Sequence, residues 1–179
     1  MYPESSYELK EIQDIKNYIL GGSGIITLSS PTGKHHTYSF NKPRNEGFPE
    51  GTIFVYCNTQ DRIWLYVGMI DKDFKFRLTR ASTWGNNCEI VKGIRYLMKI
   101  LSREISETPM KIYHCGSCAV CGRRLTDPKS IIRGIGPKCR NKLKSISNQT
   151  TSISMKLFQN STETDIKLFN IYRNNLENF

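Results

Sequence analysis

The sequence lacks several features that mark whole classes of protein. It contains no uninterrupted apolar run of the ~18 residues that a membrane-spanning helix needs. The first ten residues, MYPESSYELK, do not have the basic-then-apolar order of a secretory signal. A Walker phosphate loop, a nucleophile elbow and a paired-acid motif are also missing. We therefore expect a soluble cytoplasmic protein with reduced thiols, no membrane partner and no enzymatic activity.

Acidic residues are nearly absent from one segment of the chain. The 179 residues have a net charge of +10. The 35 residues from Met110 to Lys144 hold nine bases and a single acid, Asp127, so this segment alone carries +8. Charge concentrated in this way favours a polyanionic partner, and nucleic acid (DNA or RNA) is the predicted one. Seven side chains of the segment are predicted to contact phosphates: Arg123, Arg124, Lys129, Arg133, Lys138, Arg140 and Lys142.

Residues 1–108 carry the patterns of a compact α+β domain. Apolar residues recur at helical spacing from Leu9 to Ile19, after a capping box of Ser5 and Glu8, and Gly21-Gly22 ends this helix. A second helix of roughly 16 residues is predicted from Ile90 to Ile105. Between the helices, five segments rich in β-branched and aromatic residues are separated by turn residues: 25–29, 35–40, 52–57, 62–70 and 74–78. We predict an antiparallel β-meander of these strands, packed with the helices.

The composition divides the rest of the chain into two further parts. Residues 109–144 are rich in Cys, Gly and basic residues and are predicted to form a zinc-finger module. Residues 145–179 begin with a polar, Ser- and Asn-rich stretch and end with apolar residues that suit a short helix. We predict three parts: the α+β domain, the finger, and a polar linker with a C-terminal helix.

The finger module contains four of the six cysteines within 25 residues. Cys118-x-x-Cys121 followed by Gly122 is the tight turn that brings two sulfurs to one metal ion. Cys139 follows Pro137 closely, and proline favours the first turn of a helix. A knuckle, a hairpin and a helix that starts with a ligand form a treble-clef-like finger. The predicted cofactor is Zn²⁺, with Cys118, Cys121 and Cys139 as three of its four ligands.

The fourth ligand is either His114 or Cys115, and spacing alone leaves both open. With Cys115 the site has four thiolates, whereas with His114 it has three thiolates and one imidazole. Either choice gives a closed tetrahedral site, which lacks the open position of catalytic zinc. This is a second reason to expect no enzymatic activity.

The segment Cys118–Cys139, written CxxCGRxLTDPxSIxxGIGPxC, resembles an uncharacterised zinc-finger family of phage and plasmid proteins. Members of this family often have a histidine four residues before the first knuckle cysteine, so the resemblance favours His114 as the fourth ligand. Upstream, Gly33–Tyr38 (GKHHTY) and Trp64–Gly68 (WLYVG) are similar to segments of the β-rich domain in phage members. The resemblance implies a zinc site and a phage or mobile-element origin, in the cytoplasm of a host cell, but no reaction.

These observations predict a non-catalytic zinc protein that binds nucleic acid. Four aromatic side chains are candidates for stacking on bases: Tyr38, Tyr56, Trp64 and Tyr66. The alternative is a module that binds a host or phage protein, for example a modulator or inhibitor of host transcription or defence machinery. In that case the basic finger would either mimic or displace nucleic-acid contacts, or meet an acidic protein surface. The sequence does not indicate an oligomeric state.

Overall fold

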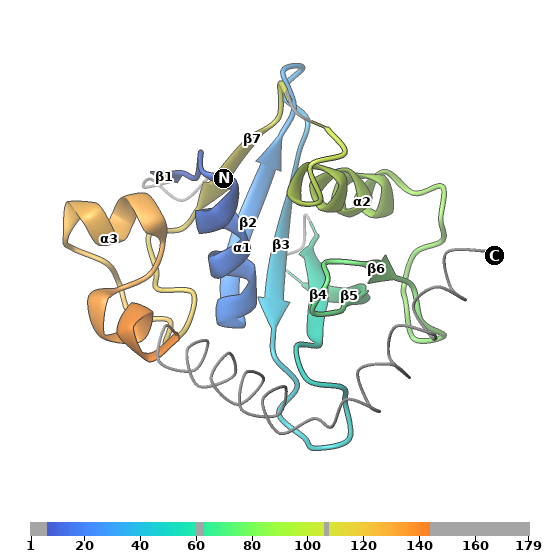
Figure 1. The fold of residues 1–179 in the computed structure, drawn as a ribbon. Helices are drawn as coiled ribbons and strands as arrows, with labels where there is room; N and C mark the ends of the chain where they lie inside the picture. The colour runs from blue at the N-terminus through green and yellow to red at the C-terminus, as the bar shows by residue number, and fades with distance from the viewer. Residues whose placement is uncertain (1–6, 60–62, 106–107, 144–179) are drawn as a thin grey trace, which may run out of the picture. The chain divides into compact units, whose positions relative to one another are not determined.

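A computed structural model describes residues 7–59, 63–105 and 108–143. The chain forms two compact units, Met1–Cys139 and Arg140–Phe179. Ten elements of the first unit appear in chain order in Figure 1: β1 (Tyr7–Glu8), α1 (Ile12–Gly21), β2 (Ser23–Ser29), β3 (His35–Asn41), β4 (Ile53–Asn58), β5 (Trp64–Ile70), β6 (Phe76–Arg77), α2 (Glu89–Leu101), β7 (Lys111–His114) and α3 (Pro128–Arg133). The strands form one seven-stranded sheet in the order β1-β7-β2-β3-β4-β5-β6.

Every neighbouring pair in this sheet is antiparallel, and β2 to β6 follow one another as a meander. The predicted α+β class and the five-stranded meander are therefore confirmed. Strand β4 shows why the pattern could be read from the sequence. Its residues are alternately buried and half-buried, with Ile53, Val55 and Cys57 pointing into the core.

Helices α1 and α2 contact each other and pack against the same face of the sheet (Figure 1). On α1, the ring of Tyr18 lies against Gly24 of β2. On α2, the carbonyl of Ile90 accepts a hydrogen bond of 2.8 Å from the hydroxyl of Tyr38 in β3. The core between these layers is aliphatic and aromatic, with Ile19, Ile94 and their neighbours fully buried.

The first helix begins later than predicted. Glu8 belongs to strand β1, where it pairs with Tyr113 of β7, and α1 begins only at Ile12 with no side-chain cap. The proposed capping box is therefore wrong, and its other member, Ser5, lies outside the described residues. Glu8 is extended because it pairs with a strand more than 100 positions away in sequence. Local sequence patterns do not report such a pairing. The end of the helix is as predicted, because Gly22 adopts the left-handed conformation with φ of 79°.

Strand β7, at the start of the predicted finger, lies inside the sheet between β1 and β2. Its residues Ile112 and His114 pair with Leu28 and Ile26 of β2. The boundary expected after residue 108 falls within the first compact unit, which continues to Cys139. The predicted linker and C-terminal helix, 145–179, lie outside the described residues.

Tyr18 joins this sheet to the cysteine-bearing segment, residues 115–139. The side chain is fully buried, and its hydroxyl makes long hydrogen bonds of 3.4 Å to the carbonyls of Ile25 and Ser117. On the other side of the ring lies Gly134, where an added Cβ would lie 2.5 Å from Cε2 of Tyr18. A side chain at Gly134 would therefore force Tyr18 out of its position.

We predict that Gly134→Ala destabilises the protein far more than Gly33→Ala. Both glycines have positive φ, 68° and 81°, but no atom lies within 4 Å of a Cβ built on Gly33. Gly33→Ala should therefore reduce the free energy of unfolding by about 1–2 kcal/mol, the cost of left-handed backbone. Gly134→Ala should cost about 1–3 kcal/mol more through overpacking against Tyr18. Urea unfolding checks this, and equal midpoints for both variants would contradict it.

Candidate metal centre

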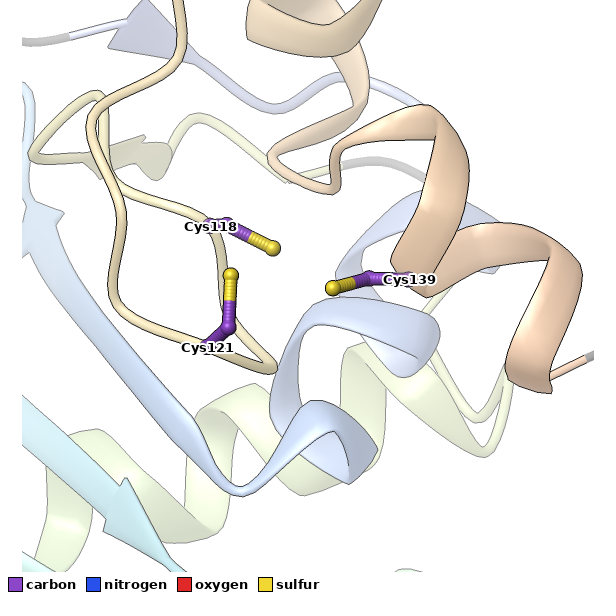
Figure 2. Close-up of side chains that lie close together, drawn as sticks. All are labelled: Cys118, Cys121 and Cys139. Atoms are coloured by element: carbon purple, nitrogen blue, oxygen red, sulfur yellow. The ribbon is translucent and has the colours of Figure 1, made fainter.

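Three cysteines converge at one end of the first unit. Atoms Sγ of Cys118, Cys121 and Cys139 all lie within 4.8 Å of one another. Figure 2 shows the three sulfurs pointing toward a common centre, two from a loop and one from a helix. Around a tetrahedral zinc with Zn–S bonds of about 2.3 Å, sulfurs lie roughly 3.8 Å apart. The thiols are thus close to the spacing that a bound ion needs, and the structure brings together three of the predicted ligands.

The loop that carries Cys118 and Cys121 is a tight hairpin. The amide of Gly122 donates to the carbonyl of Cys118 and the amide of Cys118 donates to the carbonyl of Arg123, both at 2.8 Å. Gly122 has φ of 70°, a conformation that favours glycine. An isolated antiparallel bridge between Ser117 and Arg124 closes the hairpin. This turn places both sulfurs on the same side of the loop.

Helix α3 and the turn after it position the third cysteine. The carboxylate of Asp127 caps α3 by accepting a 2.9 Å hydrogen bond from the amide of Ser130, and Gly134 ends the helix. A new helical segment starts at residue 137, so that Cys139 lies in its first turn as predicted. The amide of Ala119, between the knuckle cysteines, donates to the carbonyl of Gly134 at 3.0 Å. This bond joins the two arms that carry the sulfurs.

The electrostatics of the three thiols favour a cation. Burial raises the pKa of Cys118, but backbone N–H groups of Gly136, Cys121 and Val120 directed at its sulfur outweigh burial and lower the pKa below its ordinary value. The pKa of Cys139 is raised to about 11, first by burial and then by the neighbouring sulfurs. Cys118 therefore loses its proton more readily than an ordinary thiol, whereas Cys139 keeps its proton to a higher pH. A divalent ion would replace such protons and hold several thiolates together, so the residues fit a metal.

The structure does not bring His114 to this group. The side chain is only 2% exposed and lies between the rings of Tyr7 and Tyr18, with ring centroids at 5.6 and 5.2 Å. Its Nε2 donates to the carbonyl of Ile131 at 2.8 Å, and its Nδ1 accepts from the amide of Gly116 at 3.2 Å. Both ring nitrogens are thus engaged with the backbone. This pattern requires the neutral imidazole with its proton on Nε2.

Cys115, the alternative fourth ligand, also lies outside the group of three sulfurs. Its thiol instead lies near the hydroxyl of Tyr18, whose pKa is raised first by burial and then by this neighbour. Sequence reasoning missed Tyr18 and Tyr7 because their positions beside His114 result from the pairing of β1 with β7 and from the placement of α1. Glycines at positions 24, 116 and 134, which make room for these rings, are the signal in the sequence.

The seven predicted phosphate-binding residues belong to both compact units. In the first unit, Arg123, Arg124, Lys129 and Lys138 are exposed and Arg133 is half-buried. In the second unit, Arg140 is half-buried and Lys142 is exposed. Five of these seven basic side chains are therefore exposed, and the other two are half-buried.

We expect the stability of the metal-free protein to fall as the pH decreases below about 6.5, the ordinary value for histidine. Burial lowers the pKa of His114, although the bond to Ile131 opposes this. Below that pH the unfolded chain binds a proton that the folded chain rejects, so the free energy of unfolding falls by up to ~1.4 kcal/mol per pH unit. In urea unfolding between pH 7.5 and 5.5, His114→Gln should give a flatter dependence.

His36 should make a second, independent contribution to this pH dependence, since burial also lowers the pKa of this half-buried side chain. His36→Gln should flatten the dependence separately, and the two effects should add. An unchanged slope in His114→Gln would contradict a buried neutral His114.

Part of the chain is similar to a protein family. Residues 111–144 match DUF6011, a family of unknown function, over the segment that contains β7, the knuckle, α3 and Cys139. No curated protein and no solved structure matches the chain. None of the helices in the described ranges has the length and apolar character needed to cross a membrane. The segment around the three cysteines is thus similar to an uncharacterised family, and its chemistry has to be argued from its geometry.

Proposed function

We propose that the protein is a zinc-dependent nucleic-acid-binding protein without catalytic activity. The observation that carries this proposal is the convergence of three thiols within the most basic segment of the chain. Three thiolates select zinc over magnesium or calcium, which prefer oxygen ligands. The match with a family of unknown function neither supports nor opposes a particular activity.

The metal would organise a treble-clef-like unit. Its parts are the knuckle of Cys118 and Cys121, the short hairpin closed between Ser117 and Arg124, and the helical segment that carries Cys139. The exposed cations Arg123 and Arg124 directly follow the knuckle. Fixing the sulfurs would therefore fix the backbone from which these two side chains extend.

Three exposed cations of this unit, Arg123, Arg124 and Lys138, form no ion pair with another described residue. The ion pairs between described residues, Lys10–Glu8 and Lys92–Glu89, lie elsewhere in the structure. Asp127 is the one acid between residues 110 and 144. Its carboxylate caps α3 and interacts electrostatically with Lys129 and Arg133. Arg123, Arg124 and Lys138 are therefore the strongest candidates for phosphate contacts.

The aromatic candidates for base stacking are reduced by the structure. Tyr38 is fully buried and donates its hydroxyl hydrogen to Ile90, so it is a core residue. Tyr56 and Tyr66 are half-buried and pack edge to face at 5.5 Å. Trp64, with 39% of its surface exposed, is the best placed of the four to stack on a base.

A protein partner is the second candidate, and one feature favours it. Ile132 on α3 is 63% exposed, next to the basic residue Arg133. An apolar residue beside cations suits the edge of an interface with an acidic protein surface. A phage or mobile-element origin and a role against host machinery remain predictions of the resemblance.

We expect the purified protein to hold about one equivalent of zinc, since three thiolates form its binding site. Cys121→Ser should leave well below half an equivalent. Cys88→Ser is the matched control, because Cys88 lies outside the cluster and serine is a favourable residue at its position before α2. Elemental analysis of the three proteins checks this, and equal zinc in all three would place the metal elsewhere.

We expect the protein to bind unrelated DNA or RNA with an affinity that falls as the salt concentration rises. Replacing Arg123 and Arg124 by glutamate should weaken binding by at least about tenfold and reduce the salt dependence, without changing the zinc content. A Lys34→Glu/Lys99→Glu variant changes the net charge by the same amount as the double arginine variant. Both lysines are exposed, Lys34 in the turn before β3 and Lys99 in α2, and this variant should bind nearly as well as the wild type. Fluorescence anisotropy at two salt concentrations checks this. No binding at low salt would favour the protein partner.

A further inference from the structure

We infer that the metal centre is a three-thiolate site whose fourth coordination position is open and takes an exchangeable ligand. This inference rests on metal binding as proposed above and concerns the ligand set alone. In the isolated protein the position would hold water, and an external imidazole or thiol could replace it. A closed site with His114 or Cys115, as the sequence favours, would exclude such a ligand.

All six cysteines and all three histidines of the chain lie within the described residues. Only Cys118, Cys121 and Cys139 belong to the group within 4.8 Å. Cys57 is buried in β4, Cys88 precedes α2, and His35 and His36 lie in β3. The remaining candidates for a fourth sulfur or nitrogen are therefore His114 and Cys115.

Both ring nitrogens of His114 already have hydrogen-bond partners. Binding a metal through Nδ1 would leave the amide of Gly116 without its acceptor, and binding through Nε2 would leave the carbonyl of Ile131 without its donor. Because the site is buried between Tyr7 and Tyr18, water would not readily replace the lost partner. The imidazole is also held by its strand, since His114 pairs with Ile26 in β2 and Tyr7 in β1. Recruiting it would disturb the sheet itself.

Cys115 lies close to the hydroxyl of Tyr18, a fully buried side chain of α1, and outside the group of three sulfurs. Gly24 and Gly134 hold the Tyr18 ring on opposite sides, where even a methyl group would clash. The ring beside Cys115 therefore cannot move aside easily. Three sulfurs converge on one centre in Figure 2, and Cys115 is not among them.

The three cysteines of the group differ in their exposure to solvent. Cys118 is buried, Cys139 is half-buried and Cys121 is exposed. A small ligand can therefore approach the centre from the side of Cys121. Three protein ligands and one solvent position are also the arrangement of catalytic zinc, so the expectation of a non-catalytic protein then rests on the missing catalytic motifs and not on a closed site. Soft or borderline donors such as thiols and imidazoles are the class of ligand that such a centre would take.

X-ray absorption spectroscopy of the zinc-loaded, full-length wild type tests the ligand set without any mutation. We expect three sulfur ligands and one oxygen, without the outer-shell scattering that an imidazole ring produces. Four sulfurs would overturn the inference in favour of Cys115, and an imidazole signature would overturn it in favour of His114. A protein that binds no metal would overturn the proposed function as well, so the two failures are distinguishable.

Exchangeability is tested with cobalt, whose visible bands report its ligands. Adding imidazole to the Co²⁺-loaded wild type should shift these bands in a saturable way. Cys115→Ser and His114→Gln should keep the sulfur-to-cobalt charge-transfer intensity per bound metal, whereas Cys139→Ser should lower it by about a third if it still binds cobalt. Bands that do not respond to imidazole would overturn the inference, because a carboxylate or another protein group would then fill the position.

Discussion

The burial of Tyr18 is the contact on which the arrangement of this protein depends. The ring extends from α1 and lies between Gly24 of β2 and Gly134, and thus between the sheet and the segment that carries the cysteines. Its hydroxyl reaches the backbone of both parts, at Ile25 and Ser117. The amide of Ser23 adds a 2.8 Å hydrogen bond to the carbonyl of Ala119, inside the knuckle itself. The cysteine-bearing segment is therefore built onto the α+β layer rather than attached by a linker.

Much of this fold could be predicted because its signals are local. The alternation of buried and half-buried residues in β4 and the apolar stripe of α2 follow directly from strand and helix periodicity. The knuckle could be predicted for the same reason, since Cys118, Cys121 and Gly122 are neighbours in sequence and in space. Cys139 was also predictable, because Pro137 marks the start of the helical segment that presents it.

The parts that could not be predicted depend on distant pairing. A two-residue strand such as β1 has no periodicity of its own, and β7 is too short to distinguish a sheet strand from an extended approach to the knuckle. Once β7 lies between β1 and β2, strand alternation sends His114 to the same face as Ile112, toward α1. Spacing along the chain suggests a ligand four residues before the knuckle, whereas the sheet turns that side chain into the core. The same pairing explains why the composition change at residue 108 is not accompanied by a separate compact unit.

This attachment bears on what a bound metal would have to do. A free-standing zinc finger needs four protein ligands because the ion supplies most of its folding energy. Here Ala119 of the knuckle is hydrogen-bonded to Ser23 of the sheet and to Gly134 at the end of α3. Together with the packing of Tyr18, these bonds already hold the knuckle against the sheet and against the arm that leads to Cys139. A site supported in this way can function with three thiolates, because a fourth protein ligand is not required to join its parts. The ion would then act mainly on the position of Cys139, and so of the exposed Lys138 beside it, relative to the knuckle and to the exposed cations Arg123 and Arg124.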